Sequence, residues 1–172
     1  MTTNWAFART IIQEAEVPQH ARWRGEENGF TGIKTDLYGA INTETPLFYI
    51  ANPTVNNIRT KTYYLYLTNF NLINIPNTIS GVELLVAMDR KGRSTDETIQ
   101  LRHNDEFIGR NMADFKLDQT KTYGSDIDTW SADLTSEIIS DPSFGVGIRF
   151  QSHPSWPHRD SPLINYVKLR IW

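Results

Sequence analysis

The stretch that decides the fold is FGVGIRF, residues 144–150. Every second position carries a large apolar side chain, and the positions between them hold two glycines and an arginine. Residues 163–172, which follow a proline-rich loop, alternate in the same way, with Val167, Leu169 and Ile171 on one side. Alternation with a period of two is typical of a strand that has one face in a core and the other in water. Two such strands in succession predict an antiparallel sheet.

Other stretches extend this pattern towards the N-terminus, and they predict strands at residues 46–50, 62–70, 82–88 and 98–103. The polar residues 89–93 predict that the last two of these strands form a hairpin. Thr135 or Ser136 is placed to cap a single helical turn. Turn residues recur roughly every ten positions and about seven or eight strands are expected, so we predict an all-β fold. Its form is an antiparallel β-sandwich, jelly-roll-like, over residues 36–172.

Residues 1–35 do not alternate in this way and are interpreted as an extended N-terminal arm. Thr3 or Asn4 is a candidate cap for a short helix over residues 6–15, which Pro18 ends. The rest of the arm has too few apolar residues to pack by itself. The arm therefore either folds back over its own sandwich or docks on a neighbouring subunit during assembly.

Composition excludes several classes of protein. The net charge of −3, with 22% charged residues, gives no electrostatic footprint for nucleic acid or an anionic membrane. The chain has no cysteine, so it has no disulfide framework and no thiolate nucleophile. No stretch approaches the roughly 20 apolar residues of a membrane span, and no signal peptide is recognisable. We expect synthesis in a cytoplasm, without association with a membrane.

Two groups of side chains are candidate metal sites. His153, His158 and Asp160 form a possible metal set, but three prolines stiffen their loop and no strand or helix fixes the ligands. An exposed loop that displays Trp156 for contact with a partner is the favoured interpretation. Asp126 and Asp128, like the aspartates 89 and 96, are explained by turn formation and match no calcium-loop spacing. No metal and no cofactor is expected.

Nothing in the sequence indicates catalysis. Motifs for a nucleophilic serine, a metalloprotease, a phosphate loop and a dinucleotide site are all missing from it. Arg90, Lys91 and Arg93, with Arg102, make a small basic patch that is interpreted first as a solvated tip and second as a partner site. The chain is therefore expected not to be an enzyme.

A series of short motifs in a fixed order resembles a β-sandwich module of structural proteins in tailed-bacteriophage virions. The motifs are LTNF (67–70), IPNTISGV (75–82), DETIQL (96–101), IG (108–109), YG (123–124), TW (129–130), LT (134–135), FGVGIR (144–149) and NYVKL (165–169). The resemblance spans residues 60–172 and leaves the arm unmatched. Asn165 departs from the aspartate expected before the final Tyr-Val pair.

This resemblance implies a non-enzymatic virion protein, made in the host cytoplasm, that forms a homo-oligomer and binds other virion proteins. A capsid decoration or cement protein is expected first, and a tail, neck or baseplate component second. The candidate arm anchors are Trp5, Phe7, Ile11, Ile12 and Trp23, and the candidate surface contacts are Trp156, Arg90, Arg93 and Trp172. A carbohydrate-binding module is the alternative, with a stacking platform drawn from Tyr64, Tyr66, Trp130 and Trp156.

Overall fold

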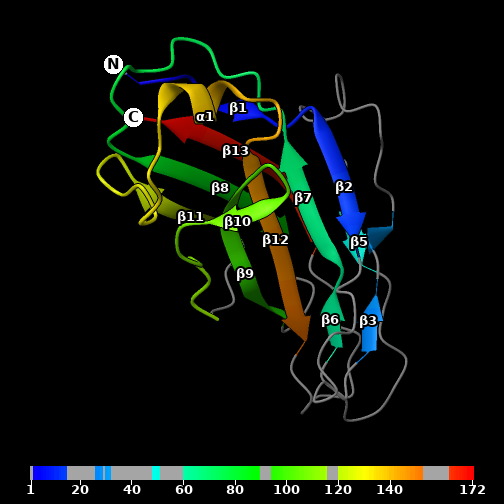
Figure 1. Cartoon of the computed structure of the whole chain (residues 1–172). Helices are drawn as coiled ribbons and strands as arrows, with labels where there is room; N and C mark the ends of the chain where they lie inside the picture. The colour runs from blue at the N-terminus through cyan, green and yellow to red at the C-terminus, as the bar shows by residue number, and fades with distance from the viewer. Residues whose placement is uncertain are drawn as a thin grey trace.

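The structure, a computed structural model, describes residues 2–14, 26–28, 30–31, 48–50, 60–89, 94–115, 120–152 and 163–172. Within these residues the strands form two sheets (Figure 1). The six-stranded sheet has the order β11-β8-β13-β5-β4, with β1 paired to β13. Its strands are β1 (Ala6–Phe7), β4 (Phe30–Thr31), β5 (Phe48–Ile50), β8 (Val82–Asp89), β11 (Thr120–Ser125) and β13 (Leu163–Ile171).

The seven-stranded sheet has the order β10-β9-β12-β6-β3, and β7 pairs with both β12 and β2. Its strands are β2 (Thr10–Glu14), β3 (Glu26–Asn28), β6 (Thr60–Thr62), β7 (Tyr64–Thr68), β9 (Ser94–His103), β10 (Glu106–Ile108) and β12 (Gly145–Ser152). Every described pairing is antiparallel except that of β3 with β6. The predicted all-β class is confirmed.

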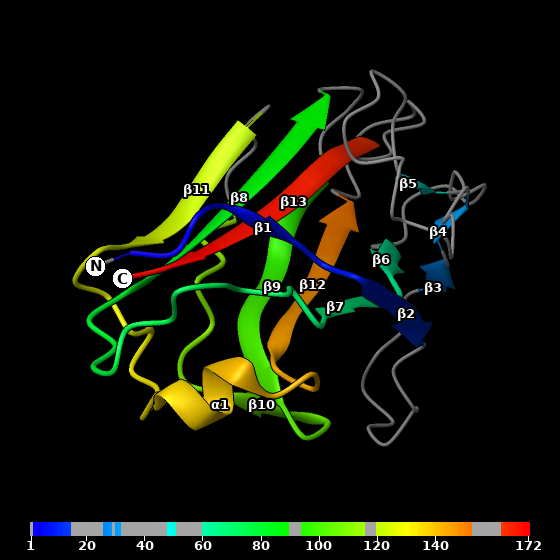
Figure 2. The same cartoon turned by 90° about the horizontal axis from the view of Figure 1, so that it is seen from above.

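The two sheets share one hydrophobic core. Figure 2 shows β8, β13 and β11 in one layer and β9, β12 and β7 in the other. Alternate residues of the central strands are fully buried between the layers: Leu84, Val86, Leu169 and Ile171 from one sheet, and Leu65, Ile99, Leu101, Val146 and Ile148 from the other. Burial of these side chains is the main stabilising contribution to the fold.

Two predicted strand relationships are corrected. The strands at 144–150 and 163–172 exist, but β12 and β13 are neighbours of other strands and lie in opposite sheets. The hairpin prediction for 82–88 and 98–103 is wrong, because β8 pairs with β11 and β13 while β9 pairs with β10 and β12. Each of these strands has one apolar face, and the apolar faces of the two sheets pack against each other. Strands that follow one another in sequence can therefore lie in opposite sheets.

The predicted N-terminal helix over residues 6–15 is also wrong. Residues 6–7 form β1 on β13, and residues 10–14 form β2 on β7, so this segment adds a strand to each sheet. Ile11 packs partly against the core, whereas Ile12 points to the other face, which is the alternation of a strand. Of the two expectations for the arm, folding back on its own sandwich describes residues 2–14. Trp23 and the 35/36 boundary lie outside the described residues.

The helix expected near residue 135 is confirmed as α1 (Ser136–Ser140). Thr135 is its N-cap, and the Thr135 hydroxyl accepts a hydrogen bond from the backbone N–H of Ile138. Ile139 is the buried residue of this helix, and Ile138 packs partly against the same core, so both isoleucines anchor the connection into β12.

Candidate functional site

The outer face of the seven-stranded sheet carries a cluster of aromatic rings. Tyr64 and Tyr66, two residues apart on β7, lie with ring centroids 5.7 Å apart and planes nearly parallel at 5°. Phe107 of β10 completes the cluster, with its ring centroid 5.5 Å from Tyr64 and 6.1 Å from Tyr66. These separations suit favourable ring–ring contact. We call the cluster, with Ile12, Arg102, Gly147 and Arg149, the aromatic face.

Two guanidinium groups cover the tyrosine rings. Arg102 lies 4.0 Å from the ring centroid of Tyr66, and Arg149 lies 4.6 Å from that of Tyr64. Both arginines are buried although they point away from the core, and Arg149 is fully so. Such cation–π pairs gain strength as they are desolvated.

Carboxylates on β9 and on the turn that follows it balance these charges. Arg102 pairs with Asp105 at 2.9 Å, and Glu97 lies 3.8 Å from Arg149. The face is thus charge-neutralised and presents aromatic and aliphatic surface.

Gly147 of β12 makes room for Phe107. A Cβ atom at this position would lie 2.4 Å from Cε1 of Phe107 and 3.2 Å from Cε1 of Tyr66. Real Cβ atoms do not approach other atoms as closely as the first of these distances, so any larger residue would displace the Phe107 ring. The glycine therefore sets the position of the aromatic cluster on the sheet.

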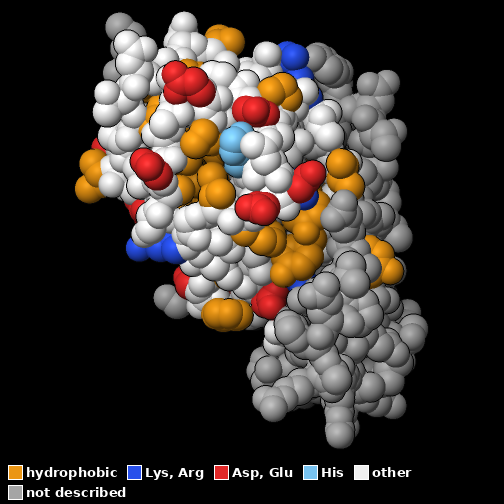
Figure 3. Space-filling model, in the orientation of Figure 1, with side chains coloured by type: hydrophobic (Ala, Val, Ile, Leu, Met, Phe, Trp, Pro, Cys, Tyr) orange, Lys and Arg blue, Asp and Glu red, His pale blue; other side chains and the backbone are white. Residues whose placement is uncertain are grey.

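Part of the aromatic face remains open to solvent. Ile12 is 49% exposed and Phe107 is 37% exposed. Ile12 is the register partner of Tyr66, so it continues the apolar surface onto β2. Figure 3 shows hydrophobic side chains gathered on the face that carries β12 and β7. A contiguous apolar patch of this kind marks an interaction site more often than scattered apolar residues do.

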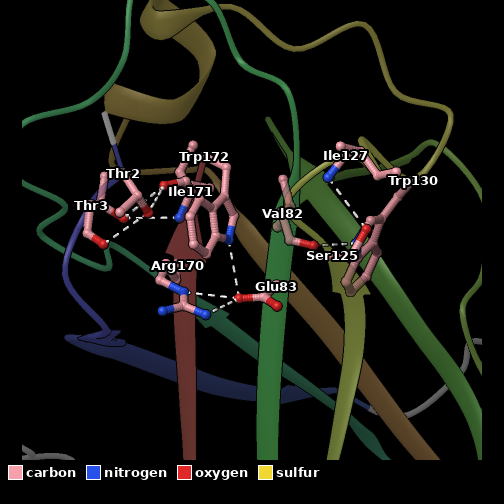
Figure 4. A network of polar contacts seen from close by, with 10 residues as sticks. All are labelled: Thr2, Thr3, Val82, Glu83, Ser125, Ile127, Trp130, Arg170, Ile171 and Trp172. Atoms are coloured by element: carbon pink, nitrogen blue, oxygen red, sulfur yellow. Dashed lines mark hydrogen bonds and ion pairs between the residues drawn. The ribbon is translucent and has the colours of Figure 1, made fainter.

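The outer face of the six-stranded sheet is arranged differently, around both chain ends (Figure 4). Arg170 lies between two indole rings, 4.5 Å from the centroid of Trp5 and 4.5 Å from that of Trp172. Glu83 Oε2 accepts hydrogen bonds from Arg170 Nε at 2.8 Å and from Trp172 Nε1 at 3.1 Å. We call these residues, with Thr3, the terminal cluster.

Thr3 ties the N-terminus to the last strand. Its backbone N–H donates to the carbonyl of Ile171 at 2.9 Å, and its hydroxyl accepts from the backbone N–H of Ile171 at 2.8 Å. Further along the same two segments, Phe7 lies over Lys168, with the Lys168 ammonium 4.9 Å from the Phe7 ring centroid. The terminal cluster therefore satisfies its own charges within the chain.

The structure places the predicted contact residues in different surroundings. Trp5 and Trp172 both contact Arg170 on the outer face of the six-stranded sheet, and Phe7 lies over Lys168, whereas Ile12 belongs to the aromatic face. Ile11 packs against the core. The remaining predicted contacts, Trp23, Arg90, Arg93 and Trp156, lie outside the described residues, as does the possible metal set His153, His158 and Asp160.

Trp130 is no part of an exposed stacking platform, because it is fully buried. Its indole N–H donates to the carbonyl of Val82 at 2.9 Å (Figure 4). Gly124 has a φ of +77°, and a Cβ there would lie 2.3 Å from Trp130 Nε1. Glycine is thus required at a position where the indole crosses β11.

Ser143, His103 and Asp141 come together near the start of β12, but not as a nucleophile with a base. The Ser143 hydroxyl donates to Asn104 Oδ1 at 3.0 Å, and His103 Nε2 lies 3.6 Å from Asp141. The backbone N–H of Ser143, first, and its hydroxyl hold the pKa of Asp141 below its ordinary value. The group ties the β9–β10 turn to the loop before β12.

Among the described residues, no group of three or more His, Asp or Glu is placed to hold a metal ion. In the same part of the chain, no helix has the length and apolar character to cross a membrane. Comparisons with protein-family models, with curated proteins and with solved structures find no match to this chain.

Two features of the aromatic face are not indicated by the sequence: the ring of Phe107 and the space that Gly147 leaves for it. Tyr64 and Tyr66 were visible as the aromatic residues of a strand, and Arg149 as part of a polar face. Phe107 follows a turn at Asn104 and Asp105, both with positive φ, in a stretch whose pattern is mixed. Nothing in the sequence indicates that β10 brings its ring across β9 to the glycine at 147.

Proposed function

We propose that this chain is a non-enzymatic structural protein of a tailed-bacteriophage virion, a jelly-roll-like sandwich that docks on a neighbouring virion protein. A capsid decoration or cement protein is the first assignment, and a tail, neck or baseplate component the second. The observation that carries the docking surface is the exposure of Phe107 and Ile12 beside packed tyrosines and arginines. Aromatic residues and arginine are enriched at protein interfaces, and preassembled rings lose little entropy on binding.

The proposal assigns the partner contact to the aromatic face rather than to Trp5 and Phe7. Those two rings lie over Arg170 and Lys168 of the same chain. The virion assignment itself rests on the order of sequence motifs between residues 60 and 172. Of the arm residues, Ile12 belongs to this proposed contact surface.

A carbohydrate-binding module receives less support from the geometry. Sugar rings stack on open aromatic faces. In this chain Arg102 and Arg149 lie over Tyr66 and Tyr64, and Trp130 is buried. Phe107 is the most exposed ring of the aromatic face, since Tyr64 and Tyr66 are half-buried. Saturable glycan binding that is lost in Phe107→Ala would favour this alternative over protein docking.

The direct test is mass spectrometry of particles purified from the source of the chain. The proposal predicts the chain in washed, intact particles at a fixed ratio to the major shell or tail protein. The variant Ile12→Ser with Phe107→Ser is expected to fold and to be lost from particles, while Ile127→Ser, at a position 83% exposed outside this face, is expected to be incorporated normally. A chain confined to the soluble lysate contradicts the proposal.

A further inference from the structure

A β-bulge turns one aspartate of β9 into the interior. Arg149 of β12 is opposite Thr98, but the next residue, Phe150, is opposite Asp96, so Glu97 is the extra residue. Because one added residue reverses which face a side chain points to, Asp96 lies on the buried side with Phe150. Its side chain is 1% exposed. Burying a carboxylate costs free energy unless the group is paired with an opposite charge and hydrogen-bonded.

An amine from the opposite sheet meets this carboxylate. Lys121 of β11 lies with its Nζ 3.2 Å from Asp96 Oδ2, and its side chain is 14% exposed. The same Nζ contacts Oδ1 of a second carboxylate, Asp114. The ammonium also lies 4.6 Å from the ring centroid of Tyr123. One amine is thus held between two carboxylates, with an aromatic wall beside it.

The two oxygens of Asp96 have unlike surroundings. Oδ2 accepts hydrogen bonds from the hydroxyl of Tyr123 at 2.9 Å and from the backbone N–H of Asp114 at 3.2 Å. Oδ1 is buried and has no hydrogen-bond partner. Donors fixed on one oxygen polarise the carboxyl carbon and stabilise negative charge that develops on that oxygen. The unpartnered oxygen is the one that is free to leave.

We propose that Lys121 and Asp96 form an intramolecular amide bond that links the two sheets covalently. Lys121 Nζ gives a proton to Asp114 and attacks the carboxyl carbon of Asp96, forming the C–N bond. The C–Oδ1 bond breaks, and Oδ1 leaves as water with the proton returned by Asp114 and a second proton from Nζ. An ammonium and a carboxylate become one neutral amide and one water, with no oxidant or reductant.

The fold favours this reaction in two ways. It holds the reacting groups side by side, which replaces a bimolecular encounter by an intramolecular one. It also excludes water from Asp96, whose side chain is buried. Because burying an ion pair has a desolvation cost, replacing that pair by a neutral amide is favoured there. The bond would join β9 to β11, and it does not depend on the virion assignment or on the aromatic face.

The test is the intact mass of the folded, full-length protein by electrospray mass spectrometry. The proposal predicts a mass lower than that of the sequence by one water molecule, and one cross-linked proteolytic peptide that contains both residues 96 and 121. Lys121→Arg keeps the charge but forms no amide, so it should restore the full mass. Asp96→Asn should lose ammonia in place of water, and Asp114→Asn should slow the reaction.

Circular dichroism establishes that each sample is folded. A folded wild-type chain with the full sequence mass, unchanged after prolonged incubation, overturns the proposal. Loss of water that persists in Lys121→Arg, or that maps to a cyclic imide without a cross-linked peptide, also overturns it. Because the wild-type mass decides the matter alone, a variant that fails to fold leaves the result intact.

Discussion

The outer faces of the two sheets both carry arginine–aromatic contacts, but one face is covered by its own chain and the other is partly exposed. In the terminal cluster, two tryptophan rings enclose Arg170, and Glu83 neutralises it. On the aromatic face, the arginines cover the tyrosines, and Phe107 and Ile12 stay partly exposed. The chain ends cover the face that carries the terminal cluster, whereas the aromatic face presents apolar side chains to solvent.

The difference shows how one fold separates stability from binding. Contacts of the terminal cluster join residues far apart in sequence, such as Thr3 and Ile171, so their loss should loosen the whole fold. The exposed part of the aromatic face makes fewer such ties, so its loss should affect partners more than folding. We therefore expect the loss of terminal-cluster contacts to lower the stability most, and changes at exposed positions to lower it least.

Removing the carboxylate of the terminal cluster should have the largest effect. Glu83→Ala leaves Arg170 and the indole N–H of Trp172 without their shared acceptor. We expect the free energy of unfolding in urea to fall by about 2 kcal/mol, since hydrogen bonds to charged groups are among the stronger ones. Glu106→Ala, at an exposed position on β10, is the matched control and should change little. Equal effects of the two variants would show that Glu83 stabilises the fold no more than an exposed glutamate does.

Filling the space under Phe107 should have a moderate effect that depends on that ring. Gly147→Ala places a Cβ against Phe107, and we expect a loss of about 1.5 kcal/mol in unfolding free energy. In a Phe107→Ala background the same substitution should cost clearly less, because the clashing atoms are gone. A double-mutant cycle in urea measures this coupling. Additive effects would show that Gly147 does not position Phe107.

Neighbouring isoleucines of β2 should behave oppositely. Ile12→Ser changes an exposed residue, so the unfolding free energy should shift by no more than about 0.5 kcal/mol. Ile11→Ser is the matched control on the core side of the same strand and should be clearly more destabilising. The reverse order would mean that β2 is shifted by one residue.

The smallest effect concerns Asp141, whose loop holds the turn before β10. The backbone N–H of Ser143 lowers the pKa of Asp141, so the carboxylate stabilises the fold above the ordinary pKa of an aspartate. This contribution should be lost as the pH falls through the lowered, folded-state pKa. A carboxyl-carbon NMR titration should show the low pKa, and Asp141→Asn should flatten the acid limb of stability against pH. An Asp141 that titrates at its ordinary value contradicts this.

Much of the fold followed from alternation, but the pairing of strands did not. The inward side chains of β12 are the same whether its neighbour in sequence lies beside it or in the opposite sheet. Alternation therefore predicts that Val146 and Ile148 are buried, and leaves open which strands are adjacent. The hairpin error at residues 89–93 has this origin.

The N-terminal helix was predicted because Ile11 and Ile12 fit a helical stripe equally well. Their backbone groups pair with β7, a tertiary partner that local sequence does not specify. Asp96 shows the same limit, since a bulge at Glu97 decides whether it faces water or the core. The sequence shows which side chains are apolar, but the face to which each one points depends on the strand pairing and its register.

Hydroxyl-radical footprinting of the free chain and of the same chain in purified particles tests the central contrast most directly. Side chains that are buried on assembly become protected from oxidation. The account predicts protection of Phe107 and Ile12 on assembly, with Trp5, Trp172 and the reference residue Ile127 unchanged. Protection of Trp5 and Trp172, with Phe107 and Ile12 as reactive in particles as in solution, would contradict it.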